Sequence, residues 1–218
     1  MSVVGRQQTE AEKETGRVEA FSDGVFAIAI TLLVLNLKVP SAGDLPAGTG
    51  LLTALLEQWP SYVAYVVSFL TILIMWINHH TLFKLITRTD HVFLMINGLL
   101  LLTISVLPFP TALAAEYIER SDQGVAAQVY CGLCVLIAVA YNLLWFYAAR
   151  DHRLLSRHVD AQAAQDITRA YRFGPLLYLF AFVLSFLNAV AGLAVCGLLA
   201  VYFALPRGMI RGEGARGR

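Results

Sequence analysis

Residues 17–35 read RVEAFSDGVFAIAITLLVL, and no ionisable side chain follows Asp23 within this stretch. A helix crosses about 30 Å of hydrocarbon with about 20 mostly apolar residues, so the stretch has the length and character of a membrane span. The whole chain has a similar character, since 58% of its 218 residues are hydrophobic and only 14% are charged. Soluble domains average about 25% charged residues, so the sequence predicts an integral membrane protein.

Four further apolar stretches follow at about 60–83, 91–114, 125–149 and 173–206, while the first covers about 20–37. The last stretch is too long for one helix but long enough for two short ones, joined by a tight turn between Asn188 and Gly192. The sequence therefore predicts an all-α, polytopic membrane protein with six transmembrane helices per subunit. These helices form one predicted domain, residues 17–206, between an N-terminal segment 1–16 and a basic tail 207–218.

The distribution of basic residues predicts which side of the membrane each loop faces. With six spans and a cytoplasmic N-terminus, all of the 16 Lys and Arg residues except Lys38 and Arg120 fall on the cytoplasmic side, as the positive-inside rule requires. We therefore expect a multi-pass protein of the cell (plasma) membrane, with both termini cytoplasmic and no cleaved signal peptide. Segment 40–50 is expected to form an outer loop. Segment 150–172 is expected to form an amphipathic cytoplasmic helix that continues from the fourth span and lies near lipid headgroups.

Several polar side chains lie inside the predicted spans, where ionisable groups are costly and are normally paired or functional. At a rise of about 1.5 Å per residue, they share one depth near the cytoplasmic surface. This predicted polar layer consists of Ser22, Asp23, Asn78, His79, His80 and Asn97. Its first interpretation is structural, because it would tie three helices together. A metal site is disfavoured because adjacent histidines on a helix point about 100° apart, and proton sensing by the histidine pair is a further alternative.

Other chemistry is not indicated. The sequence has no phosphate-binding glycine loop, nucleophile elbow or HExxH motif, so we do not expect an enzyme. Cys131 and Cys134 form a CGLC pattern inside the fourth span, and Cys196 has a similar setting, where free cysteines act as small hydrophobic residues. We expect no metal site, no cofactor and no nucleic-acid partner, and we expect contact with membrane lipid.

One face of the first span carries branched apolar residues at helical spacing. Ile28, Leu32 and Leu35 are separated by four and three residues, which places them on one face, with Thr31 at its edge. Such a stripe is most often a packing or lipid-facing surface, so taken alone it does not establish a pore.

The stretch 17–35 also resembles the RxxxFSDG helix of the transmembrane protein 175 family of potassium channels, and the sequence is identified as a prokaryotic member. WINHHTLF, residues 76–83, is similar to the histidine-containing end of that family's second helix. The resemblance implies a homo-oligomer, a tetramer in single-repeat members, whose first helices line a central pore. It also implies six helices per subunit and cytoplasmic termini.

The resemblance further assigns roles to individual residues. Ile28, Leu32 and Leu35 correspond to apolar pore constrictions, with Ile28 at the narrowest layer and a hydrophobic gate, and Thr31 corresponds to a threonine ring. A separate set, which packs the first helix against its neighbours, corresponds to Arg17, Phe21, Ser22 and Asp23. The TVGYG carbonyl filter is absent from the sequence, so we expect modest selectivity from an apolar constriction.

Three functions follow from these patterns. The leading prediction is a passive, potassium-preferring cation channel with potassium ions as the permeant species. The alternative is a proton-coupled small-solute transporter that uses Asp23 and the His79/His80 pair, although the broken helices and inverted repeats of many transporters are not evident. The third is a structural or lipid-binding membrane subunit.

Overall fold

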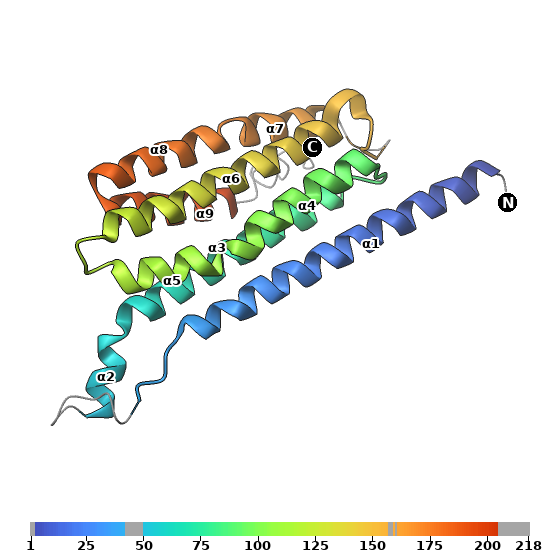
Figure 1. The fold of residues 1–218 in the computed structure, drawn as a ribbon. Coiled ribbons are helices and arrows are strands. Elements are labelled where there is room, and N and C mark those ends of the chain that lie inside the picture. The colour runs from blue at the N-terminus through green and yellow to red at the C-terminus, as the bar shows by residue number, and fades with distance from the viewer. Residues whose placement is uncertain (1–2, 42–49, 157–158, 160, 205–218) are drawn as a thin grey trace, which may run out of the picture.

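The computed structural model describes residues 3–41, 50–156, 159 and 161–204, and nearly all of these residues are helical (Figure 1). In chain order the elements are α1 (Val3–Leu32), the 3-10 turn η1 (Leu33–Asn36), α2 (Leu51–Glu57), α3 (Trp59–Phe83), α4 (His91–Val106), α5 (Pro108–Tyr117), α6 (Gln123–Ala149), the 3-10 turn η2 (Arg150–His152), α7 (Ala161–Arg172), α8 (Gly174–Leu187) and α9 (Ala189–Ala204). The all-helical prediction is confirmed. The basic tail 207–218 and most of the predicted outer loop lie outside the described residues.

Among the residues that the structure describes, five helical segments are long and apolar enough to cross a membrane: Lys13–Asn36, Trp59–Phe83, His91–Tyr117, Gln123–Ala149 and Ile167–Leu187. A shorter apolar helix, Ala189–Phe203, follows the fifth. The chain leaves helical geometry at Asn188, at the start of the predicted turn. There the Asn188 Oδ1 accepts a hydrogen bond from the Ala191 N–H at 2.9 Å and caps α9.

The third candidate span is broken at Pro108. Proline has no backbone N–H to donate to the preceding turn, so α4 ends at Val106 and α5 begins at Pro108. The break frees polar backbone groups in the membrane interior, and these require partners. The Ile104 carbonyl, which lacks the Pro108 N–H as a donor, accepts instead from the Leu107 N–H at 3.1 Å. The Pro108 carbonyl accepts from the Asn36 side chain, at the end of the first span.

Segment 150–172 differs from the prediction of a helix that continues from the fourth span. Asp151 has φ 53°, a left-handed conformation that ends the helix. The following residues instead pair with the loop between α3 and α4: the Thr87 N–H donates to the Leu154 carbonyl at 3.0 Å, and the Ser156 N–H donates to the Leu85 carbonyl at 2.8 Å. This pairing satisfies backbone groups that a continuous helix would have satisfied internally, and α7 forms as a separate helix.

Asp90 fixes the same junction between α4 and the segment that follows α6. Its carboxylate caps α4 by accepting from the Phe93 N–H at 2.9 Å, accepts from the Tyr147 hydroxyl at 2.8 Å, and lies 3.1 Å from the Arg153 guanidinium. The Phe93 hydrogen bond, with help from Tyr147 and Arg153, lowers the pKa of Asp90 below its ordinary value. The junction is therefore strongest when Asp90 is ionised.

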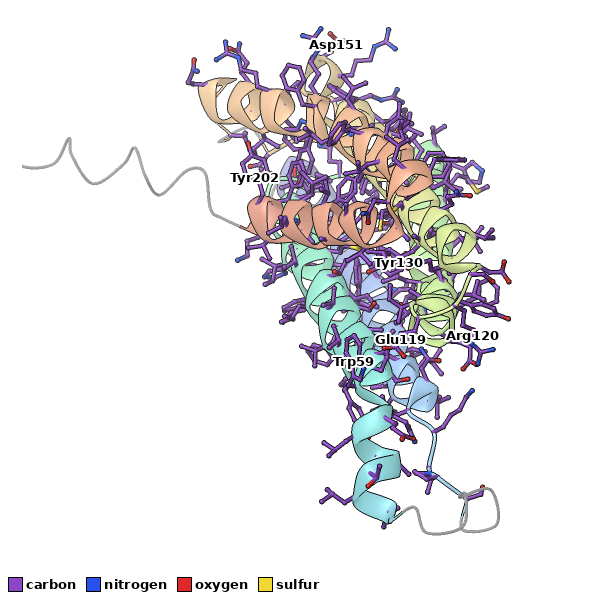
Figure 2. All side chains as sticks on the ribbon, turned by 90° about the vertical axis from the view of Figure 1, so that its left-hand side faces the viewer. Trp59, Glu119, Arg120, Tyr130, Asp151 and Tyr202 are labelled. Atoms are coloured by element: carbon purple, nitrogen blue, oxygen red, sulfur yellow. The ribbon has the colours of Figure 1, made fainter. Side chains whose placement is uncertain are left out.

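The helices pack around α6, whose Leu144 and Trp145 are fully buried. Figure 1 shows α1 along one edge of the bundle, with its N-terminal part extending beyond the other helices. Figure 2 shows Trp59, Glu119 and Arg120 toward one end of the bundle and Asp151 at the other. The edge position leaves one side of α1 uncovered by its own subunit.

Candidate pore helix and its anchors

The two sides of α1 have opposite environments. Ser22, Phe26 and Leu33 are each no more than 1% exposed and pack against the bundle. On the opposite side, Ile28 is 60% exposed and Leu35 is 73% exposed. A helix that buries one apolar side and leaves a second apolar side open has a further surface to cover, with lipid or with another protein chain.

The exposed side forms a continuous stripe of residues, which we call the seam. It consists of Arg17, Phe21, Gly24, Ile28, Thr31 and Leu35, all exposed. Their spacings alternate between four and three residues, which is the heptad spacing that keeps one seam of a helix facing a partner helix. Leu32, at 41% exposure, borders the stripe. The four residues predicted to constrict a pore therefore lie on or beside one open seam.

Thr31 is oriented by its own helix. Its hydroxyl donates to the carbonyl of Ile28 at 2.9 Å, so the hydroxyl hydrogen is committed to the backbone. The oxygen lone pairs remain, and they can accept or coordinate but not donate. On an open seam, such an oxygen offers a ligand to a cation.

A chain of hydrogen bonds joins α1, α3 and α4 through Ser22, His79 and Asn97. The Ser22 hydroxyl donates to the Val18 carbonyl at 2.9 Å, and the Asn97 amide Nδ2 donates to the Ser22 Oγ at 2.9 Å. The Asn97 Oδ1 is then the acceptor for the His79 Nε2–H at 3.0 Å. These directions assign the proton of the neutral imidazole to Nε2.

The other side of His79 is apolar. Its ring stacks on Phe83 at a centroid distance of 4.4 Å and lies 5.3 Å from the ring of Phe26. The Nδ1 atom is buried and has no hydrogen-bond partner among the described residues. A proton added at Nδ1 would place a cation there without an acceptor, so the surroundings favour the neutral ring.

A second set of contacts joins α1 to α3. The Trp76 Nε1–H donates to the Asp23 Oδ1 at 2.8 Å, and the His80 Nδ1 lies 2.7 Å from the Glu19 Oε1. The Trp76 and His80 rings stack with 11° between their planes. Glu19 and Asp23 are four residues apart on α1, and Trp76 and His80 are four residues apart on α3. Two successive turns of α1 therefore contact two successive turns of α3.

The Asn36 end of the first span has its own polar contacts. The Asn36 Nδ2 donates to the Pro108 carbonyl at 3.1 Å, and the Lys38 Nζ lies 3.1 Å from the Glu116 carboxylate. Arg120 pairs with the same carboxylate at 2.6 Å. These bonds hold η1, and with it Leu35, against α5.

Comparison with known proteins identifies this arrangement. The family model described as endosomal/lysosomal potassium channel TMEM175 matches residues 17–108, which include the seam and both sets of contacts. A protein of Chamaesiphon minutus, named as a potassium channel, is 53% identical over 194 residues, which cover 89% of this chain and 95% of that protein. The chain belongs to the TMEM175 family.

Further members support the assignment along most of the chain. A protein of Streptomyces collinus, also named as a potassium channel, is 49% identical over 192 residues, covering 87% of this chain and 91% of that protein. The crystal structure of a lysosomal potassium-selective channel TMEM175 homolog from Chamaesiphon minutus matches with a TM-score of 0.80 at 52% identity, over 88% of this chain and 97% of that chain. The TMEM175 family is one of ion channels in the membrane, so the chain is a multi-pass membrane protein and not an enzyme.

Some of the predicted site residues of this TMEM175 family member lie apart from the hydrogen-bonded sets. Arg17 and Phe21 line a hollow of about 420 Å³ between α1 and α4. Asn78 lines a separate cleft formed with α6, α8 and α9. The structure therefore brings together Ser22, His79 and Asn97, and separately Asp23 and His80 through partners on the facing helix.

Glu19 and Trp76 were not among the predicted site residues. The signal for Glu19 is its position four residues before Asp23, which places both carboxylates on the side of α1 that faces α3. Trp76 lies four residues before His80 in the same way. In the part of the chain that the structure describes, no group of three His, Cys, Asp or Glu residues could hold a metal ion.

Proposed function

We propose that this chain forms a potassium-preferring cation channel in which the α1 helices of several copies, four by analogy with single-repeat family members, surround a central pore. The observation that carries the proposal is the open seam of α1, with Ile28 60% exposed while the opposite side of the same helix is buried. The names of the relatives from Chamaesiphon minutus and Streptomyces collinus support potassium as the permeant ion. Conduction is passive and requires no cofactor.

In this proposal the chain crosses the cell membrane six times, with both termini in the cytoplasm. The sixth crossing is α9, whose 16 residues extend about 24 Å at about 1.5 Å per residue. This is shorter than the hydrocarbon core, and local thinning or an α8–α9 pair accommodates such a mismatch. Arg120 and Asp151 lie at opposite ends of the bundle in Figure 2, in agreement with the proposed sidedness.

The chemistry of the seam supports cation passage and modest selectivity. A ring of Ile28 side chains offers no ligands, so a narrow ring excludes water and blocks, and a wider ring conducts. One turn farther outward, a ring of Thr31 oxygens would present lone pairs rather than hydroxyl hydrogens to the ion, which favours cations. Potassium sheds its hydration water at lower cost than sodium, so an apolar constriction favours potassium without a carbonyl filter.

The contacts do not favour the transporter alternative. A relay through Asp23, His79 and His80 requires these groups to exchange protons with one another. Asp23 accepts instead from Trp76, His79 bonds to Asn97 and His80 to Glu19. None of the three groups bonds directly to another of them. The third possibility, a structural subunit without transport, is distinguished by recording.

The test is potassium flux and single-channel recording with purified protein in liposomes. Ile28→Asn should wet the constriction, raise the conductance and reduce the preference for potassium over sodium. The matched control is Leu198→Asn on α9, an apolar residue 69% exposed and far from the seam in sequence, which should leave the current unchanged. Absence of any potassium current at all voltages would reject the channel, and an unchanged current in Ile28→Asn would remove Ile28 from the pore.

A further inference from the structure

The open seam on α1 has two borders that differ in size, and among the seam residues Phe21 lies toward the border nearer α4 and Gly24 toward the border nearer α3. Phe21 is 67% exposed and lies on the border nearer α4, because it lines the hollow shared with Leu94 and Gly98. The other border lies nearer α3. At about the level of Phe21 along the helix axis it carries only the small residues Gly16 and Ala20, and both are exposed. At 100° per residue, Phe21 and Ala20 point to opposite sides of the seam. A large residue thus stands on one border and small residues on the other.

The glycines on the small border, Gly16 and Gly24, have no close neighbour among the described residues of their own chain. A Cβ atom added at Gly16 or at Gly24 would meet nothing within 4 Å, whereas one added at Gly192 would lie 2.7 Å from the Ser185 Cβ. Glycine weakens a helix interior, so its presence usually reflects a close approach that a larger side chain would prevent. Gly192 has such a neighbour in its own chain, and Gly16 and Gly24 do not.

The charges next to the borders are complementary. Glu14 lines the same hollow as Phe21, while Lys13 projects on the side of Ala20. Both are exposed, and neither forms an ion pair with the described residues of its own subunit. If parallel α1 helices stand side by side, Glu14 of one copy meets Lys13 of the next at nearly the same height.

We propose that Phe21 of each copy packs on the Gly16–Ala20–Gly24 edge of the α1 helix of the neighbouring copy. The contact is heterologous, because the large border of one copy meets the small border of the next, and such contacts close into a ring when the rotation allows. The seam packs against a second copy of this chain rather than against lipid. Lipid acyl chains carry no charge that could pair with Glu14, and they do not require glycine for a close approach. The inference rests on the proposed function, since it assumes that the α1 helices surround a common axis.

Directed cross-linking tests the contact. Two differently tagged copies, one with Ala20→Cys and one with Phe21→Cys, are expressed together and oxidised with copper(II) phenanthroline. As the disulfide forms, two copper(II) ions each accept one electron, and the two thiol protons pass to the solvent. The mixed dimer should exceed, several-fold, the dimer from either variant alone. The native cysteines Cys131, Cys134 and Cys196 are buried, and the unsubstituted chain measures their background.

A size exchange tests the same contact without oxidation. Ala20→Phe should convert oligomer to monomer in detergent while the helical content is retained, because position 20 is exposed in the subunit. The double variant Ala20→Phe with Phe21→Ala restores one large and one small border and should recover the oligomer. The control Leu198→Phe, on an exposed position of α9, should remain oligomeric.

The outcomes separate this inference from the channel itself. An oligomer that conducts potassium but gives no excess of the mixed dimer, or that tolerates Ala20→Phe, overturns the Phe21 contact and leaves the channel in place. A monomeric, non-conducting wild-type protein overturns both. An excess of mixed dimer together with recovery in the double variant supports the contact.

Discussion

Asn97 is the residue on which the buried hydrogen-bond chain depends, and its replacement by leucine gives the sharpest test of that chain. Its amide uses both ends, accepting from His79 at 3.0 Å and donating to Ser22 at 2.9 Å. Leucine has a similar size but no polar atom. In Asn97→Leu the His79 ring, which already has an unpartnered Nδ1, would lose its remaining partner in a site with 0% exposure.

The expected cost follows from these losses. Hydrogen bonds between membrane helices contribute about 0.6 kcal/mol on average, so two of them account for about 1 kcal/mol. Leaving the Nε2–H of His79 buried and unpaired adds about 1–3 kcal/mol. We expect Asn97→Leu to lower the free energy of unfolding by roughly 2–4 kcal/mol, which at about 2–4 °C per kcal/mol is a fall in Tm of roughly 5–15 °C.

The measurement is thermal or denaturant unfolding in detergent, with Asn142→Leu as the matched control. Asn142 is also a buried asparagine inside a helix, but its amide donates only to the Ala138 carbonyl of its own helix. Asn142→Leu should therefore cost much less, and His79→Phe with Asn97→Leu should cost less than the sum of the two single variants. Equal losses for Asn97→Leu and Asn142→Leu, or an additive double variant, would refute the proposed hydrogen-bond chain.

Two further predictions concern the connections between helices. Gly192→Ala should destabilise the α8–α9 turn by about 1–3 kcal/mol, because the added Cβ would lie 2.7 Å from the Ser185 Cβ. The control Gly197→Ala, whose added Cβ has its nearest contact at 3.8 Å, should be tolerated. The unfolding midpoints of the two variants in detergent test this difference. Asp90 has a lowered pKa, so its stabilisation is complete above the unfolded carboxyl pKa of about 4 and is lost as pH falls through the lower folded value. Between about pH 5 and pH 2 the wild type should therefore lose its stability advantage over Asp90→Asn, and a constant difference between their unfolding midpoints across this range would contradict the assignment.

The helix positions were predictable because long apolar runs and Pro or Gly breaks are local signals. The segments expected at 60–83 and 125–149 correspond closely to α3 and α6. The separate α7 was not predictable in the same way, because the end of α6 depends on pairing between Leu154 and Thr87, which are distant in sequence. A local pattern contains no information about such a partner.

The candidate site was also predictable only in part: the depth of its residues along the helices was predictable, but their direction around the helix axis was not. Depth along the helices was enough to group Ser22, His79 and Asn97, because residues at equal depth on neighbouring spans can meet. Depth does not give direction around a helix axis, which is why Asn78 was placed in the same layer although it lines a different cleft. The rotation of each helix is set by packing on both of its sides, which the sequence of one helix does not specify.

Polar contacts hold the part of the first span between Glu19 and Asn36 to the rest of the chain at both ends of that part. At one end they involve Ser22, Asp23 and Glu19, and at the other end Asn36. Between these ends, the described side chains contact α3 and α4 through apolar packing, as at Phe26 and Leu33. Apolar contacts are not directional, so this middle part can shift or rotate by a small amount without breaking a hydrogen bond, while the ends cannot.

One proposed constriction residue lies in the part held by apolar packing, and another lies beside a polar contact. Ile28 lies in this middle part, between the two sets of polar contacts, whereas Leu35 lies in η1, next to the Asn36 bond to the Pro108 carbonyl. A change in pore width that preserves the anchors must then be larger at Ile28 than at Leu35. Under the proposed function, Ile28 is therefore the layer that opens and closes, and Leu35 is a fixed outer ring. Accessibility of a cysteine at position 28 should change with the conducting state, while that of a cysteine at position 35 should stay constant.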